Sequence, residues 1–294
     1  AYTDVRTVMN SELRRALMPT IAMGSRKGRQ MMNDFAGIDL EKQVDHVLAY
    51  IEPLEPPAAP APDAQQAPTD ARAPQGPQGM MLVQGSFEQP RIEQFIRDHG
   101  GTIETYNGHS MSVRREGPEE IAIGFVRPDL IAVGKASLVR RTLDLPNDAS
   151  ARTPDLTSNA ELMDLIRDAS GSSDWVVGHF DAVRRGMRLP SAVSGQVPAV
   201  RLVSAKADVN GGVKATIRAE TADQAAAGQL REVVRGFVAL ANLQSVARPE
   251  FESALKSIQV SGTDKTVQMT FTMSPETMRA LAPRPRRPPE PRSP

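Results

Sequence analysis

The 294-residue sequence contains no cysteine. This absence excludes disulfide frameworks, thiolate zinc sites, iron–sulfur clusters and cysteine nucleophiles. The sequence also lacks any apolar run of roughly 18 residues, so no transmembrane helix is expected. An excess of basic charge is missing too, since 35 Lys and Arg balance 35 Asp and Glu. We therefore expect no nucleic-acid partner, because binding to phosphates needs a basic face.

Proline is abundant and marks the domain organisation. Of the 24 prolines, eight fall in residues 53–77 and six in residues 283–294. Both stretches lack aromatic residues and hold few large aliphatic ones, so they bury too little apolar surface to offset chain entropy. We predict a flexible Pro/Ala-rich insertion at 53–79 and a disordered Pro/Arg tail at 283–294. A first folded unit then comprises 1–52 and 80–150, and a second comprises 151–282.

Alternating apolar residues and turn residues predict strands and four antiparallel hairpins. One strand is expected at 80–87, and Asn107-Gly108 predicts a tight turn between two strands because both turn positions favour positive φ. The four predicted hairpins are 102–115, 120–134, 201–220 and 257–273. No βαβ alternation appears between them, which disfavours a doubly wound or barrel architecture.

Helices are expected between these hairpins. Their predicted first turns contain Pro90, Ser158 with Glu161 as a capping box, Thr221 with Gln224, and Ser274. The longest helix is predicted at 222–246, with an apolar stripe that includes Leu230, Phe237 and Leu240.

The order of these elements predicts an internal repeat. Residues 80–145 read strand, helix, hairpin, hairpin, helix, and residues 174–282 read strand, helix, hairpin, long helix, hairpin, helix. The predicted fold class is α+β, with a duplicated unit of antiparallel β-hairpins and helices packed on one face of the sheet.

The opening of the chain is similar to residues 175–189. Each stretch has a short apolar strand, then an aspartate and a helical segment, so Asp4 and Asp181 occupy equivalent places. We expect each aspartate to cap a helix. Only three strand residues precede Asp4, so we expect further residues upstream of Ala1, which could have included a signal peptide.

Several stretches together resemble a known family. They are FAGIDLEKQVDHVLAYIE (35–52), IAIGFVRPDLIAVGKASLVRRTLD (121–144), TSNAELMDLI (157–166) and WVVGHFDAV (175–183). They look like a family of exported bacterial proteins, of the type found in acidobacteria, that carries a domain of unknown function. The resemblance implies an α+β repeat fold and a periplasmic or secreted location, and it implies no activity.

Motifs for phosphate or nucleophilic chemistry are weak. Gly134-Lys135 does not belong to a phosphate-binding loop, because Asp129 and Ala136 replace the required glycine and hydroxyl residue. Ser253 and Lys256 match an S-x-x-K pattern, in which the lysine could assist a serine nucleophile. The motifs that accompany this pattern in serine β-lactamases and penicillin-binding proteins are missing, since there is no S-D-N and Lys265-Thr266 is followed by Val267 and not by glycine.

Metal ligation is not expected either. The four histidines are His46, His99, His109 and His179, and they lack the local spacing of a catalytic zinc site. The sequence thus assigns no catalytic, cofactor-binding or metal-ligating residue, and no cofactor.

Two functional hypotheses from different classes remain. The first is a non-enzymatic exported binding or scaffold protein that recognises an envelope protein, a peptide or an apolar ligand. The second is a hydrolase with an unrecognised active site, built on Ser253 and Lys256 or on carboxylates around Asp181. Convergent ionisable groups in a cleft would favour the second. The oligomeric state is left open.

Overall fold

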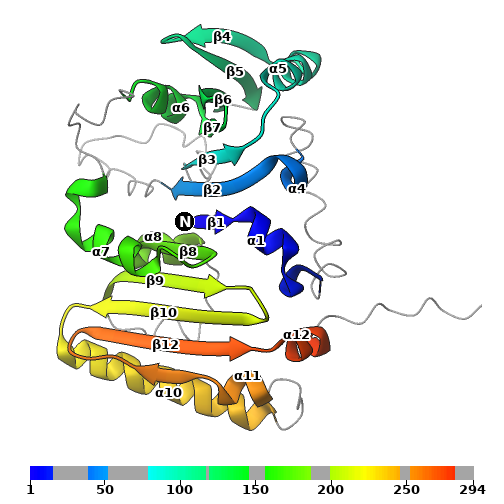
Figure 1. Cartoon of the computed structure of the whole chain (residues 1–294). Helices are drawn as coiled ribbons and strands as arrows, with labels where there is room; N and C mark the ends of the chain where they lie inside the picture. Colours follow the sequence, from blue (N-terminus) through cyan, green and yellow to red (C-terminus); the bar gives the residue numbers. More distant parts are fainter. Residues whose placement is uncertain are drawn as a thin grey trace, which may run out of the picture.

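The structure is a computed structural model that describes residues 1–15, 39–51, 79–116, 119–145, 156–186, 199–245 and 252–281 (Figure 1). The predicted tail at 283–294 lies outside the described residues. So does the predicted insertion at 53–79, except for Gly79.

The described strands form one twelve-stranded sheet. In chain order they are β1 (Tyr2–Asp4), β2 (Val44–Ile51), β3 (Gly79–Gly85), β4 (Thr102–Tyr106), β5 (His109–Glu116), β6 (Glu119–Arg127), β7 (Leu130–Lys135), β8 (Asp174–His179), β9 (Val200–Asp208), β10 (Val213–Thr221), β11 (Gln259–Ser261) and β12 (Thr266–Met273).

The helices of the described chain lie between these strands. They are α1 (Val5–Asn10), α4 (Leu40–Gln43), α5 (Gln89–Asp98), α6 (Ala136–Leu143), α7 (Ala160–Ala169), α8 (Phe180–Gly186), α10 (Gln224–Ser245), α11 (Glu252–Lys256) and α12 (Pro275–Leu281), with a 3₁₀ turn at Leu156–Ser158. None of them is long and apolar enough to cross a membrane.

Every pair of neighbouring strands in the sheet is antiparallel, in the order β11-β12-β10-β9-β8-β1-β2-β3-β7-β6-β5-β4. The α+β class is therefore confirmed. The N-terminal strand β1 lies between β2 and β8 in the middle of the sheet (Figure 1). All four predicted hairpins form, as β4-β5, β6-β7, β9-β10 and β11-β12. Asn107 and Gly108 adopt φ of 48° and 79°, as their tight turn requires.

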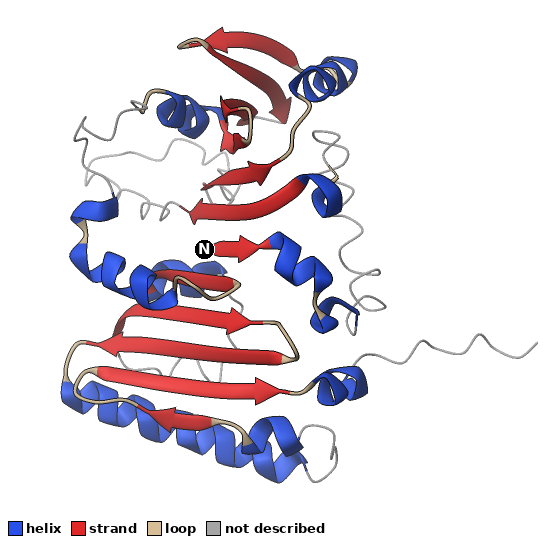
Figure 2. Ribbon diagram, viewed as in Figure 1, coloured by secondary structure: helices blue, strands red, loops and turns tan. Residues whose placement is uncertain are grey.

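Helices cover both faces of the sheet, so the prediction that they pack on one face is wrong (Figure 2). Alternate residues of β6 show the reason, because side chains of a strand point alternately to opposite faces. Ile123 and Phe125 pack with Ile92 and Ile96 of α5. Ala122 instead packs in a second cluster that includes Val139 and Leu143 of α6. We refer to the two sides as the α5 face and the α6 face.

The cross-strand register assigns residues at the centre of the sheet to these two faces, because directly opposite residues of paired strands lie on the same face. On the α6 face, one row of opposite residues runs through Ala132, Leu82, Leu48, Tyr2 and Trp175. The next residue of this row, Lys206, donates to the backbone carbonyl of Asp168 at 2.6 Å, which places α7 on the α6 face.

On the α5 face, another row runs through Gly178, Val203, Ala219 and Val267. Val183 of α8 lies against Gly178, while α10 packs around Val267. Helices α1, α5, α8 and α10 therefore share this face.

The start of α12 is as predicted, since Ser274 accepts from the Thr277 amide at 3.2 Å, but the starts of α7 and α10 differ from prediction by one or two residues. The cap of α7 is Asn159 and not Ser158, because the Asn159 side chain accepts from the Leu162 amide at 3.1 Å. The first turn of α10 is held by Asp223, which accepts from the Ala226 amide at 2.8 Å. The apolar stripe of α10 is buried only at its start, since Leu230 is buried but Leu240 is 50% exposed.

We predict that Gly124→Val destabilises the protein by about 1–3 kcal/mol through overpacking. An added Cβ would lie 2.8 Å from Cγ1 of Val139 and 3.0 Å from Cδ1 of Leu143. The matched control is Gly228→Ala in α10, where an added Cβ meets nothing within 4 Å. It should stabilise by about 0.4–1 kcal/mol. Urea unfolding midpoints measure both changes, and equal midpoints for the two variants would contradict the packing described for α6.

Candidate functional site

An open cavity of about 420 Å³ lies where the two halves of the sheet meet. Its walls come from β1 and the start of α1, the segment between α7 and β8, the end of β9 and the β9–β10 turn. The lining residues are Tyr2, Asp4, Thr7, Ser170, Gly171, Ser172, Ser173, Trp175, Asp208 and Asn210. We refer to it as the junction cavity.

A stack of three rings crosses strands β8, β1 and β2 beside this cavity. The rings of Trp175 and Tyr2 lie 5.6 Å apart at an interplanar angle of 19°, and those of Tyr2 and His46 lie 5.8 Å apart at 21°. The Tyr2 hydroxyl is 3.0 Å from Nδ1 of His46. This bond fixes the Tyr2 ring, so Tyr2 and Trp175 form a pre-organised aromatic wall.

Two carboxylates complete the wall. Asp4 caps α1, accepting from the amide of Thr7 at 2.9 Å and from its hydroxyl at 2.8 Å. Burial alone raises the pKa of Asp4, but these hydrogen bonds outweigh it and leave the pKa below its ordinary value. Asp208 accepts from the Ser173 amide at 3.2 Å. Among the described residues, no Lys or Arg forms an ion pair with either carboxylate.

A third carboxylate, Asp174, lies behind the cavity on the α5 face, opposite Thr3. Burial raises the pKa of Asp174, and the nearby charges of Asp4 and Asp208 raise it further. The joint between the halves therefore concentrates negative charge.

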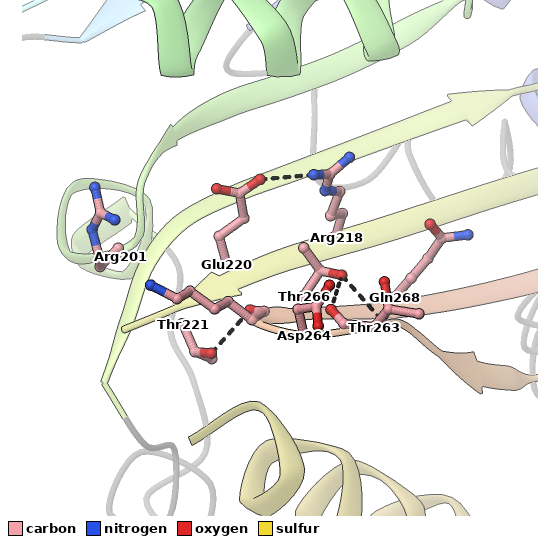
Figure 3. Close-up of a pocket in the computed structure, with 9 residues that line it drawn as sticks. Arg201, Arg218, Glu220, Thr221, Thr263, Asp264, Thr266 and Gln268 are labelled. Atoms are coloured by element: carbon pink, nitrogen blue, oxygen red, sulfur yellow. Dashed lines mark hydrogen bonds and ion pairs between the residues drawn. The ribbon is translucent and has the colours of Figure 1, made fainter. Parts of the chain in front are cut away.

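A second cavity of about 470 Å³ lies on β10 and β12, and two of its arginines are paired with glutamates, one pair of which Figure 3 shows. Arg218 pairs with Glu220 at 2.9 Å, and Arg201 contacts both carboxylate oxygens of Glu161 at 2.9 and 3.0 Å. Its lining residues are Arg201, Arg218, Glu220, Thr221, Thr263, Asp264, Lys265, Thr266 and Gln268. With no apolar or aromatic wall, it has the character of a solvated sheet face.

The serine and lysine singled out in the sequence do not converge. The Ser253 hydroxyl is 2.9 Å from Oγ1 of Thr277 in α12, whereas Nζ of Lys256 pairs with Glu252 at 2.5 Å. Both residues belong to α11, and each has a structural partner of its own.

The two aspartates compared in the sequence differ in position. Asp4 is a helix cap, as predicted. Asp181 is not one, because α8 already begins at Phe180 and Asp181 lies in its first turn. It does not line the junction cavity.

The four histidines are dispersed. His46 joins the ring stack, Nδ1 of His99 lies 2.7 Å from the Phe95 carbonyl, and Nδ1 of His109 lies 2.9 Å from the Phe125 carbonyl. His179 is exposed at the end of β8. Within the described ranges, no group of three or more His, Asp or Glu residues is placed to hold a metal ion.

Sequence reasoning missed the pairing of Tyr2 with Trp175. It compared the strand before Asp4 with the strand before Asp181, and so placed the two strands in equivalent positions without placing them side by side. The available signal was the position of Trp175, the only tryptophan, in the strand that resembles the opening of the chain.

Comparison with protein families and with curated proteins finds no match to this chain. Among solved structures, the chain is similar to crystal form IV of TP0453, with a TM-score of 0.44 and 11% sequence identity over 95% of this chain and 90% of that one. A similarity at this level says nothing about what the chain binds.

We predict that Asp4→Ala lowers the free energy of unfolding by about 1 kcal/mol, because α1 loses its cap. Asp4→Asn is the matched control and should lose less than alanine, since asparagine still accepts from the Thr7 amide but lacks the charge that these hydrogen bonds favour. Denaturant unfolding at neutral pH measures both. Equal losses for alanine and asparagine would show that the charge of Asp4, and not its cap, stabilises the fold.

Asp174→Asn should stabilise the protein at neutral pH. A carboxyl with a raised folded-state pKa opposes folding while it is ionised, and this cost disappears as pH falls through that pKa. The advantage of the asparagine variant should therefore be greatest near pH 7 and should vanish near pH 3, where the aspartate is protonated in both states. Unfolding midpoints across this pH range test it. If Asp174→Asn were less stable than the parent at pH 7, the raised pKa of Asp174 would be contradicted.

Proposed function

We propose that this protein is a non-enzymatic binding protein that recognises a peptide, or an exposed segment of another protein, through the junction cavity. The composition of the cavity carries the proposal. Tyr2 and Trp175 offer large rigid contact areas, and Asn210 and the backbone at Gly171 offer hydrogen-bonding groups. Protein-recognition surfaces favour this set, because aromatic rings contribute contact area at low entropic cost and small polar residues adjust to the partner.

An apolar ligand fits this cavity poorly. Sites for such ligands are lined mainly by aliphatic and aromatic side chains. Here both aromatic residues stand among hydroxyl, amide and carboxylate groups, and no aliphatic side chain contributes. Burying these polar groups against a hydrocarbon would leave their hydrogen bonds unmade, at a cost of about 1–3 kcal/mol for each group.

Asp4 and Asp208 are two ionisable groups at one cavity, which is the feature that favours the hydrolase hypothesis. Hydrolysis by a serine nucleophile, however, finds little support in the same geometry. A serine nucleophile needs a base within hydrogen-bonding reach. The Ser173 hydroxyl donates to the Ala207 carbonyl at 2.9 Å, and Nδ1 of His46 is engaged by Tyr2. No serine contacts a histidine or lysine side chain in the part of the cavity wall that the structure describes, and Ser253 and Lys256 are separately engaged.

Export to the periplasm or cell surface is part of this proposal. It depends on the family resemblance of residues 35–52, 121–144, 157–166 and 175–183. The absence of cysteine is compatible with either an oxidising or a reducing compartment. Fractionation of the native host, with the protein followed by antibody, tests this part, and recovery in the cytoplasm alone would refute it.

We further infer that the sheet contains a duplicated unit. The strands on the two sides of the β1–β8 pair are connected in the same order. Going outward, they are β1-β2-β3-β7-β6 in the first half and β8-β9-β10-β12-β11 in the second. The hairpin β4-β5 adds two strands to the edge of the first half. Helices α1 and α8 follow equivalent strands on the α5 face, as do α5 and α10. Superposition of the halves in an experimental structure tests the inference, and equivalent helices on opposite faces would refute it.

The proposed function predicts that an array of random octapeptides binds the protein at a restricted subset of sequences. Peptides from that subset should change the emission of Trp175, the only tryptophan. Ser172→Phe should reduce binding at least about tenfold by filling the cavity. The matched control is Thr270→Phe, because Thr270 lies on β12 outside both cavities.

An enzymatic assay provides the opposing outcome. The purified protein should show no turnover of ester, amide, glycoside or phosphoester substrates above a blank. Turnover that disappears in Ser253→Ala or Lys256→Ala would overturn the binding proposal in favour of a hydrolase.

A further inference from the structure

We infer that the junction cavity selects a cationic side chain, a lysine or arginine of the bound peptide, and holds it between the aromatic wall and two carboxylates. The inference rests on the proposed function and names the chemistry that the cavity recognises. Three independent features support it: charge, ring geometry and size.

The charge of the cavity is negative. Asp4 and Asp208 line it, and the described lining residues include no lysine or arginine. Two lysines stand close by. Lys206 is engaged by the carboxylate of Asp168 at 3.2 Å, and Lys214, opposite Asp208 in β10, forms no ion pair with it among the described residues. Both carboxylates are thus held by hydrogen bonds from neutral groups, and each keeps lone pairs for a donor in the cavity.

The ring geometry favours a cation in the same place. A positive charge over an aromatic face is attracted by the quadrupole of the ring, and tryptophan and tyrosine are the strongest partners. Tyr2 is the middle ring of the stack, between His46 and Trp175, so Trp175, at the end of the stack, is the ring with a face left for a cation. Both rings line the cavity together with Asp4 and Asp208. A guanidinium or ammonium group bound there would contact rings and carboxylates at once.

The size of the cavity admits a side chain. Its volume of about 420 Å³ lies within the roughly 300–1,000 Å³ of small-ligand sites. A bare metal ion is disfavoured, since no group of three His, Asp or Glu residues is placed to hold one in the described chain. The amide of Asn210 stands at the same cavity, where it could bond to the peptide backbone. The hydroxyls of Ser170 and Ser172 already donate to the Arg167 carbonyl and to Asp208, at 2.9 and 3.5 Å, so they could bond to the peptide as acceptors.

The experiment compares three peptides that differ at one position: acetyl-Gly-Lys-Gly-amide and its norleucine and glutamate counterparts. Norleucine keeps the aliphatic stem of lysine and removes the charge. Emission of Trp175 and isothermal titration calorimetry report binding independently. The lysine peptide should bind about tenfold more tightly than the norleucine peptide, and the glutamate peptide more weakly still. The preference should shrink between roughly 50 and 500 mM NaCl.

Two variants test whether the preference for the lysine peptide depends on the carboxylate of Asp208. Asp208→Asn keeps an acceptor for the Ser173 amide and removes one charge, so it should weaken the lysine peptide about fivefold and leave the norleucine peptide unchanged. The matched control is Glu220→Gln in the second cavity, which should change neither affinity. Circular dichroism of each variant verifies folding.

The outcomes separate the two proposals. Equal affinity for the lysine and norleucine peptides overturns the cation inference and leaves the peptide-binding function standing. An unchanged lysine preference in Asp208→Asn also overturns it. If no peptide produces heat or a change in Trp175 emission, while octapeptides selected on the array do, the cavity binds a different chemistry. If the selected octapeptides fail as well, the proposed function itself falls.

Discussion

The pairing of β1 with β8 is the contact on which the rest of the structure depends. It consists of two opposite pairs, Tyr2 with Trp175 and Thr3 with Asp174, and of the Asp4 amide donating to the Ser173 carbonyl at 2.7 Å. Through this short ladder two multistranded halves become one sheet. The ring stack, the carboxylates and the junction cavity all arise there, because each takes residues from both halves.

The joint is not built for stability alone. Three aspartates lie close enough that Asp4 and Asp208 raise the pKa of Asp174. A joint selected only for strength would use apolar residues or matched ion pairs, as Arg201 and Glu161 are matched elsewhere on the sheet. Sites that bind ligands commonly keep such unfavourable arrangements, since the partner supplies the compensating interaction. The positive charge of the proposed ligand would compensate the negative charge of the joint.

Local signals predicted much of the fold and little of the site. Asn107-Gly108 and the alternating strands placed all four hairpins because turn geometry and side-chain alternation are encoded within a few residues. The helix that packs on each face of the sheet is not encoded within a few residues. Gly124 leaves room for Val139 and Leu143 on one side of β6 while Ile123 packs with α5 on the other, and both residues fit a strand pattern equally well. One-sided helix packing was therefore the wrong expectation.

The site required long-range register. Tyr2 and Trp175 are far apart in the chain, and only the sheet order places one opposite the other. Asp208 is the last residue of β9, and no motif in the sequence marks it. Even the correct assignment of Asp4 as a cap gave no hint that its carboxylate also faces a cavity.

The central position of β1 has a consequence for how the chain folds. β1 is the first described strand of the chain, but its partner β8 follows β2 to β7 and ends only at His179. Until β8 pairs with β1, an edge of the first half remains open in the middle of what will become the sheet. Exposed edges of this kind invite pairing with other chains. The pairing of β1 with β8 therefore also closes the edge that would otherwise be open to other chains.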